Sequence, residues 1–158
     1  IAVALIVVVV DQVTKLAVIE FIELYGRVNV APFLNLTHQK NPGAAFSFLA
    51  DAGGWQRWFF IVLATAISIV IVAWLWRSRT SAPLPLAAGL ALVLGGAVGN
   101  LVDRVAHGHV TDFIQVWFGS WPFPSFNVAD AAISVGAALL IIDSLFFSGR
   151  SPAESPDN

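Results

Sequence analysis

The sequence predicts an all-α membrane protein with four transmembrane helices, a small extracytoplasmic β element, and a short extracytoplasmic segment between spans three and four. Hydrophobic residues make up 58% of the 158-residue chain and charged residues only 11%. Soluble domains carry roughly 25% charged residues. Four windows of the sequence hold the ~20 apolar residues that a helix needs to cross the hydrocarbon core of a bilayer. We therefore expect a single integral membrane domain over residues 1–147.

The four apolar windows give the approximate positions of the spans. They cover about residues 1–22, 58–76, 86–102 and 128–147. Tryptophans flank the second window, as the aromatic belt at a membrane interface does. The tail over residues 148–158 is polar and rich in Pro and Ser, so we expect it to be disordered. The chain contains no Met, so we expect further residues to precede Ile1.

The distribution of basic residues predicts the orientation of the spans. An even number of spans puts both termini on the same side of the membrane. The short loop between spans two and three contains Arg77 and Arg79 and no acidic residue, which is typical of a cytoplasmic loop. Both termini and the tail are therefore expected in the cytoplasm. Segments 23–57 and 103–127 are expected outside it.

The first extracytoplasmic segment has the pattern of a β element. In FLNLTHQK (33–40), leucines alternate with polar residues, which is the period of a half-buried strand. The tripeptide NPG (41–43) is typical of a turn. In the following AAFSFL (44–49), two phenylalanines fall on one face of an extended chain. We expect a β element at about residues 29–50, lying on the membrane surface.

Composition excludes several kinds of site and partner. The chain has no Cys, which excludes disulfides, thiol nucleophiles and thiolate metal sites. Its net charge of −2 and the lack of a basic stripe argue against nucleic acid as a partner. His107 and His109, with Asp103 or Asp112, could supply three zinc ligands. The chain has no H-E-x-x-H motif, however, and we expect these histidines to contact solvent or headgroups, with no metal and no cofactor bound.

Polar and small residues within the spans suggest how the helices pack. Asp11 and Lys15 are one helical turn apart, so we expect a structural ion pair that fixes span one against its neighbours. Gly95 and Gly99 form a G-x-x-x-G pattern that lets another helix approach closely. Asn100 falls at the outer end of the same span, where its amide can bridge helices or hold a loop.

Two carboxylates predict a chemical function. Asp112 and Asp130 both fall on the outer side in the expected topology. Two carboxylates held together in a poorly hydrated site share one proton. One can then activate a water molecule while the other polarises a carbonyl, as in aspartic proteases. The alternative is structural, because Asp130 lies in the first turn of a helix, where the macrodipole favours an acid, and Asn127 can cap that helix.

The residues leave two other classes of protein open. A small proton-coupled transporter or channel would use Asp11, Lys15, Asp103 and Asp130 as a relay. Such a relay places carboxylates at several depths in the membrane, whereas three of the acids here fall at one surface. A non-catalytic membrane scaffold is the second alternative, but it gives the clustered charged and polar residues no function.

Five sequence blocks together resemble the lipoprotein signal peptidase (signal peptidase II, or prolipoprotein signal peptidase) family. They occur in the family's order and cover the chain except its tail. The blocks are DQVTK (11–15), NPGAAFS (41–47), GGAVGNLVDR (95–104), VTDF (110–113) and FNVAD (126–130). The resemblance implies an aspartic endopeptidase of the bacterial plasma (inner) membrane. It implies cleavage of prolipoproteins before a diacylglyceryl-modified cysteine, near the extracytoplasmic surface.

The same resemblance assigns roles to individual residues. It implies that Asp112 and Asp130 are the catalytic pair, with Asp103 holding Arg104 and its loop. The implied partners are the lipidated precursor and membrane lipids, and we expect a monomer. The residues implied to bind substrate or support the site are Asn41, Gly43, Asn100, Asp103, Arg104, Asn127, Asp11 and Lys15.

Overall fold

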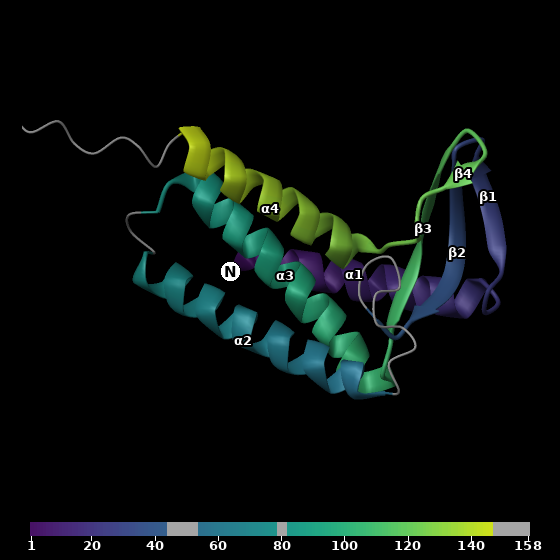
Figure 1. The fold of residues 1–158 in the computed structure, drawn as a ribbon, viewed down its shortest axis with the longest axis horizontal. Coiled ribbons are helices and arrows are strands. Elements are labelled where there is room, and N and C mark those ends of the chain that lie inside the picture. Colours follow the sequence, from purple (N-terminus) through teal and green to yellow (C-terminus); the bar gives the residue numbers. More distant parts are fainter. Residues whose placement is uncertain (44–53, 79–81, 147–158) are drawn as a thin grey trace, which may run out of the picture.

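The computed structural model describes residues 1–43, 54–78 and 82–146, which form four long helices and a four-stranded antiparallel sheet (Figure 1). The helices are α1 (Ala2–Phe21), α2 (Trp55–Arg77), α3 (Leu84–His107) and α4 (Val128–Phe146). The strands are β1 (Arg27–Ala31), β2 (Leu34–Asn41), β3 (Val110–Phe118) and β4 (Trp121–Pro122). All four helices are long and apolar enough to cross a membrane, which confirms the predicted class.

The third span is longer than the sequence predicted. It was expected to end at about residue 102, but α3 continues to His107 and ends at Gly108, whose φ is +80°. The left-handed conformation favours glycine at this helix end. Asp103, Arg104 and His107 therefore lie on the helix rather than in a loop that follows it. The extra turn carries these side chains towards the sheet.

Helix α3 is the centre of the bundle and packs against the other three helices (Figure 1). Small residues permit this, as the G-x-x-x-G pattern predicted. A Cβ atom at Gly95 would stand 2.7 Å from the Cβ of Val7 in α1. A Cβ atom at Gly136 in α4 would stand 2.7 Å from the carbonyl oxygen of Gly89 in α3. Because neither distance is possible for a real side chain, larger residues there would force the helices apart.

The sheet has the strand order β1-β2-β3-β4 and lies at the end of the bundle where α3 ends and α4 begins (Figure 1). The segment between α3 and α4, for which the sequence predicted no strands, supplies β3 and β4. The sequence VTDFIQVWF (110–118) is rich in β-branched and aromatic residues and lies between Gly108 and Gly119, both with positive φ. The predicted continuation of the β element over residues 44–50 and the tail 148–158 lie outside the described residues.

Strand β2 is the strand expected from residues 33–40, but its polar side chains are the more buried ones. Asn35 and Thr37 are 7% and 3% exposed, whereas Leu34 and Leu36 are partly exposed. Thr37 Oγ1 lies 3.4 Å from Ser125 Oγ, in the segment that leads into α4. His38 Nδ1 lies 2.9 Å from the carbonyl oxygen of Ile22, just after α1. These contacts fix the sheet to the ends of two helices, and so fix the strand that carries Asp112.

Candidate active site

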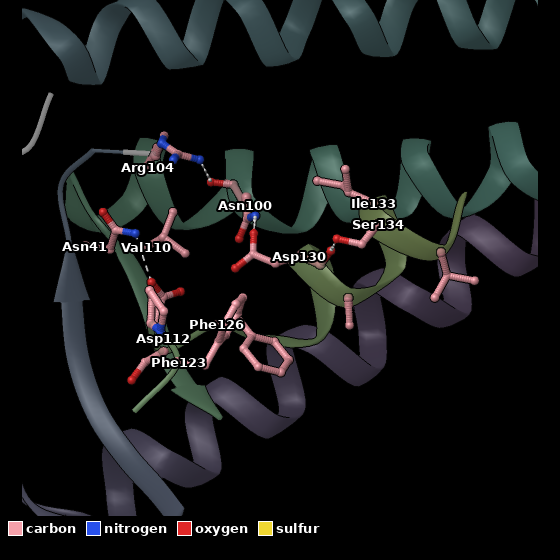
Figure 2. A pocket seen from close by; sticks show the side chains of 14 residues that line it. Asn41, Asn100, Arg104, Val110, Asp112, Phe123, Phe126, Asp130, Ile133 and Ser134 are labelled. Carbon is pink, nitrogen blue, oxygen red and sulfur yellow. Dashed lines mark hydrogen bonds between the residues drawn. The ribbon is translucent and has the colours of Figure 1, made fainter. Parts of the chain in front are cut away.

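A cavity of about 570 Å³ lies where β2, β3, α3 and α4 meet (Figure 2). The polar residues around it come from all four elements. Asn41 ends β2, Asp112 lies in β3, Asn100 and Arg104 lie in α3, and Asp130 lies in the first turn of α4. Figure 2 shows the side chains of Asp112 and Asp130 on opposite sides of this space. The fold therefore brings together both predicted carboxylates, although they lie in different elements and 17 residues separate them in the sequence.

Asp112 is buried and accepts hydrogen bonds on both carboxylate oxygens. Asn41 Nδ2 donates to Oδ2 at 2.9 Å, and Asn127 Nδ2 donates to Oδ1 at 2.7 Å. Burial, and next the negative charge of Asp130, raise the pKa of Asp112 to about 7. The two amide hydrogen bonds and the positive charge of Lys15 lower the pKa and so oppose this rise. Near neutral pH this carboxyl group can therefore either hold or release a proton.

Asp130 is held by a reciprocal capping arrangement at the start of α4. Its backbone N–H donates to Asn127 Oδ1 at 2.9 Å, and the Asn127 backbone N–H donates to Asp130 Oδ2 at 3.3 Å. Asn100 Nδ2 donates to the other carboxylate oxygen, Oδ1, at 2.8 Å (Figure 2). The Asn127 side chain thus contacts Asp112 and caps the helix of Asp130, and it is completely buried. The predicted N-cap is confirmed, and the same residue joins the two carboxylates.

The ion pair expected in span one is present and has a third member. Lys15 Nζ lies 2.8 Å from Asp11 Oδ2 and 3.0 Å from Asp103 Oδ2. This corrects the role expected for Asp103, which was to hold Arg104. Asp103 instead pairs with Lys15 and accepts a hydrogen bond from the Thr111 backbone N–H at 3.1 Å. The expectation that Asp103 holds the following segment is confirmed by this second contact.

Arg104 binds backbone carbonyls and an aromatic ring. Its Nη2 donates to the carbonyl oxygen of Gly43 at 2.7 Å, and its guanidinium lies 4.9 Å from the centre of the Phe60 ring. The Gly43 backbone N–H donates to Asn41 Oδ1 at 3.0 Å. Arg104 and Asn41 therefore fix the turn after β2 from both sides. Gly43 and Arg104, 61 residues apart in sequence, are therefore in direct contact beside the cavity.

Two residues that the sequence did not single out, Gln12 and Arg57, contact elements of the site. Gln12 Nε2 donates to Asp103 Oδ1 at 2.9 Å and to the Gly99 carbonyl oxygen at 3.2 Å. Its position beside Asp11, in a stretch where polar residues interrupt an apolar helix, was the available signal. Arg57 donates to the last carbonyls of α3, from Nε to Arg104 O and from Nη2 to Val105 O, both at 2.9 Å. Nothing in the sequence indicated that Arg57, 47 residues earlier, would cap this helix end.

His107 and His109 lie close together at the end of α3. Their ring centres are 6.0 Å apart, and His109 Nδ1 lies 3.0 Å from the His107 carbonyl oxygen. Burial, and next the positive charge of Lys40, lower the pKa of His109. Within residues 1–43, 54–78 and 82–146, no three His, Asp or Glu side chains are arranged to hold a metal ion. That the protein needs no metal remains a prediction.

Comparison with known proteins identifies the family. The family model described as signal peptidase (SPase) II matches residues 3–146. The chain belongs to the signal peptidase II family. The sequence is 50% identical to the lipoprotein signal peptidase of Alteromonas mediterranea over 145 residues, which are 91% of this chain and 78% of that protein. It is 53% identical to the lipoprotein signal peptidase of Cellvibrio japonicus over 126 residues, which are 80% of this chain and 74% of that protein.

Solved structures agree with this assignment. A structure described as a bacterial membrane enzyme has a TM-score of 0.84 and 33% sequence identity to this chain, and the match covers 98% of this chain and 92% of the other. A second one has a TM-score of 0.77 and 34% identity, covering 93% and 92%. The chain is therefore an aspartic peptidase of the signal peptidase II family and a bacterial membrane enzyme. The resemblance drawn from the five sequence blocks is confirmed.

Proposed function

We propose that this protein removes signal peptides from prolipoproteins by hydrolysing the peptide bond before a diacylglyceryl-modified cysteine, with water activated by Asp112 and Asp130. One observation carries this proposal. The buried carboxylate of Asp112 and the partly buried carboxylate of Asp130, from different elements, line one cavity, and a single residue, Asn127, contacts both. An acid that served only to cap α4 would not need a second carboxylate beside it. The similarity to lipoprotein signal peptidases supports the choice of substrate.

The reaction uses the two carboxyl groups as one unit that shares a proton. The ionised member takes a proton from a water molecule, and the water oxygen bonds to the scissile carbonyl carbon. The protonated member donates its proton to the carbonyl oxygen, which gives a tetrahedral diol. The C–N bond then breaks: the protonated carboxyl group gives its proton to the departing amine, and the ionised one takes a proton from a diol hydroxyl, which restores the carbonyl and the singly protonated pair. A pKa of about 7 for Asp112 supports a singly protonated pair near neutral pH.

The lining of the cavity suits a substrate that is polar at one point and apolar elsewhere. The carboxylates and amides occupy one end, near α3 and β3. Phe123 and Phe126 before α4, and Ile133 and Val135 on α4, provide apolar surface that continues from it. Val135 is 54% exposed, so this surface is open to the lipid that surrounds the spans. A scissile bond next to a cysteine with acyl chains would present this combination of groups.

We further propose that the enzyme lies in the bacterial plasma (inner) membrane as a single domain, with both termini cytoplasmic and its site near the extracytoplasmic surface. Arg77 ends α2 at the end of the bundle opposite the sheet (Figure 1). A basic residue at that end supports a cytoplasmic location for it, and so an outer location for the cavity. The partners proposed are the lipidated precursor and membrane lipids, with the enzyme acting as a monomer and without nucleic acid or cofactor. Arg79, on which the orientation also depends, lies outside the described residues.

Cleavage of a defined precursor tests the proposal. The purified protein in detergent is given a synthetic diacylglyceryl-modified precursor and, separately, the same peptide without the lipid. We expect mass spectrometry to locate one cut, directly before the modified cysteine, in the first peptide only. Asp112→Asn should abolish the cut, and Glu20→Gln, which changes an exposed acid of α1, should not. A cut at another bond, or equal cleavage of both peptides, would contradict the proposed substrate.

A further inference from the structure

Lys15 makes three contacts deep in the bundle, although it lies outside the cavity. Its side chain is 2% exposed. The ammonium group contacts Asp11 Oδ2 at 2.8 Å, Asp103 Oδ2 at 3.0 Å and Asn100 Oδ1 at 3.0 Å. An ammonium group has three N–H donors and no acceptor, so these three contacts use it completely. Each of the three partners makes a further contact that leads to one of the two carboxylates of the cavity.

The first contact leads to the helix start that carries Asp130. While Asp11 Oδ2 contacts Lys15, its Oδ1 accepts a hydrogen bond from the backbone N–H of Ala129 at 2.9 Å. Ala129 directly precedes Asp130 and is completely buried. Asp11 thereby satisfies one of the free N–H groups in the first turn of α4. This contact fixes the depth of α4 relative to α1.

The second contact leads to the strand that carries Asp112. Asp103 Oδ2, which contacts Lys15, also accepts the hydrogen bond from the Thr111 backbone N–H. Thr111 directly precedes Asp112 and is buried. Gln12 joins this contact to the first one, because its Nε2 donates to Asp103 Oδ1 at 2.9 Å and to Asp11 Oδ2 at 3.2 Å. The backbone beside each carboxylate is therefore held by an acid that forms an ion pair with Lys15.

The third contact sets the direction of an amide. Lys15 can only donate, so it requires the oxygen of the Asn100 amide to face it. Asn127 Nδ2, also a donor, lies 3.3 Å from the same oxygen. The Asn100 nitrogen must then point the other way, where it donates to Asp130 Oδ1 at 2.8 Å. A reversed amide would place its oxygen against the Asp130 carboxylate and lose three hydrogen bonds.

We propose that Lys15 is a positioning residue for the hydrolysis, which holds both carboxylates in place through Asp11, Asp103 and Asn100. The proposal rests on the proposed function, because it assigns the two carboxylates to the reaction. It also assigns Asp11 and Asp103 to the support of the backbone rather than to the activation of water. Gln12 completes the arrangement by joining the two supporting acids.

Lys15 has an electrostatic effect that a purely structural residue would not have. The charged groups that face Asp112 are Asp130 from α4, Lys15 from α1 and Arg104 from α3. The positive charge of Lys15 lowers the pKa of Asp112. Removing this charge raises the pKa, so the pH above which cleavage declines moves upward. A variant that was merely loosely packed would lose activity, but its cleavage would decline at the same pH as that of the wild type.

The test compares Lys15→Met with Thr14→Val in single-turnover cleavage of the lipidated precursor between pH 5.5 and 9.5. Methionine keeps the length of the side chain and removes all three donors. We expect cleavage by Lys15→Met to fall at least about 100-fold, since small misplacements of reacting groups cost that much. Its decline at alkaline pH should start at higher pH, and its affinity for the precursor should change little. Thr14 bonds only to carbonyls of its own helix, so Thr14→Val should match the wild type.

A second variant separates positioning from charge balance. Lys15→Met with Asp11→Asn removes one buried acid together with the lysine, and so avoids an excess of buried negative charge. We expect its melting temperature to recover relative to Lys15→Met, and its turnover to stay low. Recovery of turnover in this double variant would overturn the proposal, as would wild-type cleavage and pH dependence in Lys15→Met. If the wild type itself did not cleave the precursor, the proposed function would be at fault instead.

Discussion

The pH dependence of cleavage follows from the environment of Asp112. Its pKa of about 7 means that the group loses its proton as the pH rises through neutrality. When both carboxyl groups are ionised, no proton is available for the scissile carbonyl, and the reaction stops. About nine-tenths of the groups are protonated one pH unit below the pKa and about 1% two units above it. Cleavage at pH 9 should therefore be about 100-fold slower than at pH 6.

A substitution on β2 tests whether Asp112 is the group responsible. Asn41 donates a hydrogen bond to Asp112 and lowers its pKa. In Asn41→Leu the pKa is higher, so the alkaline decline should move to higher pH. Asn35→Leu is a matched control on the same strand, because Asn35 donates to Gln115 and is not among the principal groups that shift the pKa of Asp112. Its decline should coincide with that of the wild type.

The assay is single-turnover cleavage, measured from pH 5.5 to 9.5 in one detergent. The enzyme is in excess over the precursor, at a concentration above the dissociation constant of the complex. Thermal melting at each pH shows whether the enzyme remains folded. Because the two carboxyl groups interact, the measured midpoint belongs to the pair. A wild-type rate that stays constant up to pH 9 would refute the reasoning. A decline that moved to lower pH in Asn41→Leu would refute the assignment to Asp112.

Four further outcomes follow from the structure. Asp112→Asn and Asp130→Asn should each lower single-turnover cleavage by several orders of magnitude, and the double variant should be hardly slower than either, because the pair acts as one unit; additive losses would separate their roles. The raised pKa of Asp112 adds stability that is fully present below about pH 3.8 and lost as the pH rises to about 7. The fall in melting temperature between pH 4 and pH 8 should thus be smaller in Asp112→Asn than in the wild type. EDTA should leave cleavage unchanged, and a loss that zinc restored would indicate a metal site. A topology reporter fused after Ser78 should report the cytoplasm, and one inserted at Gly119 should report the outside; the reverse would place the cavity on the wrong face.

The helices could be predicted because membrane insertion constrains their sequences directly. A span must be apolar for about 20 residues, and four windows satisfied this condition. The end of α3 could not be predicted, because Asp103, Arg104 and His107 look like the polar residues of a loop. In the fold Asp103 pairs with Lys15 and Arg104 donates to the carbonyl oxygen of Gly43, both of which belong to distant elements. Hydropathy alone cannot anticipate such long-range partners.

Only part of the sheet could be predicted, again because the sequence pattern does not show which residues meet in the fold. The alternation in β2 was visible, but the polar residues Asn35 and Thr37 proved to be the buried ones. Alternation shows that two faces differ and does not show which face meets protein. Strand β3 was not predicted because VTDFIQVWF does not alternate between apolar and polar residues, and its first four residues are all buried in the fold. Its pairing with β2, with Asn41 opposite Val110, is what brings Asn41 to Asp112.

The residues of the site were easier to find than their connections. Sequence motifs placed the two carboxylates and their amide partners, since each lies in a distinctive block. Proximity in sequence then suggested Arg104 as the partner of its neighbour Asp103. Adjacent residues on a helix point about 100° apart, so they rarely face each other. The actual partner, Lys15, lies in another helix, 88 positions earlier, at a distance of 3.0 Å.

The structural and catalytic interpretations of Asp130 turn out to be compatible. A carboxylate three residues after Asn127 forms a capping box and is favoured by the positive end of the helix. The same capping box fixes the Asn127 side chain, whose Nδ2 then reaches Asp112 at 2.7 Å. A helix start therefore provides what a pair of interacting carboxylates needs, namely a fixed backbone, local N–H donors and a rigid amide between them. In a site beside lipid, where an unsatisfied polar group is costly, the cap thus satisfies the start of α4 and at the same time fixes the amide that joins the two carboxylates.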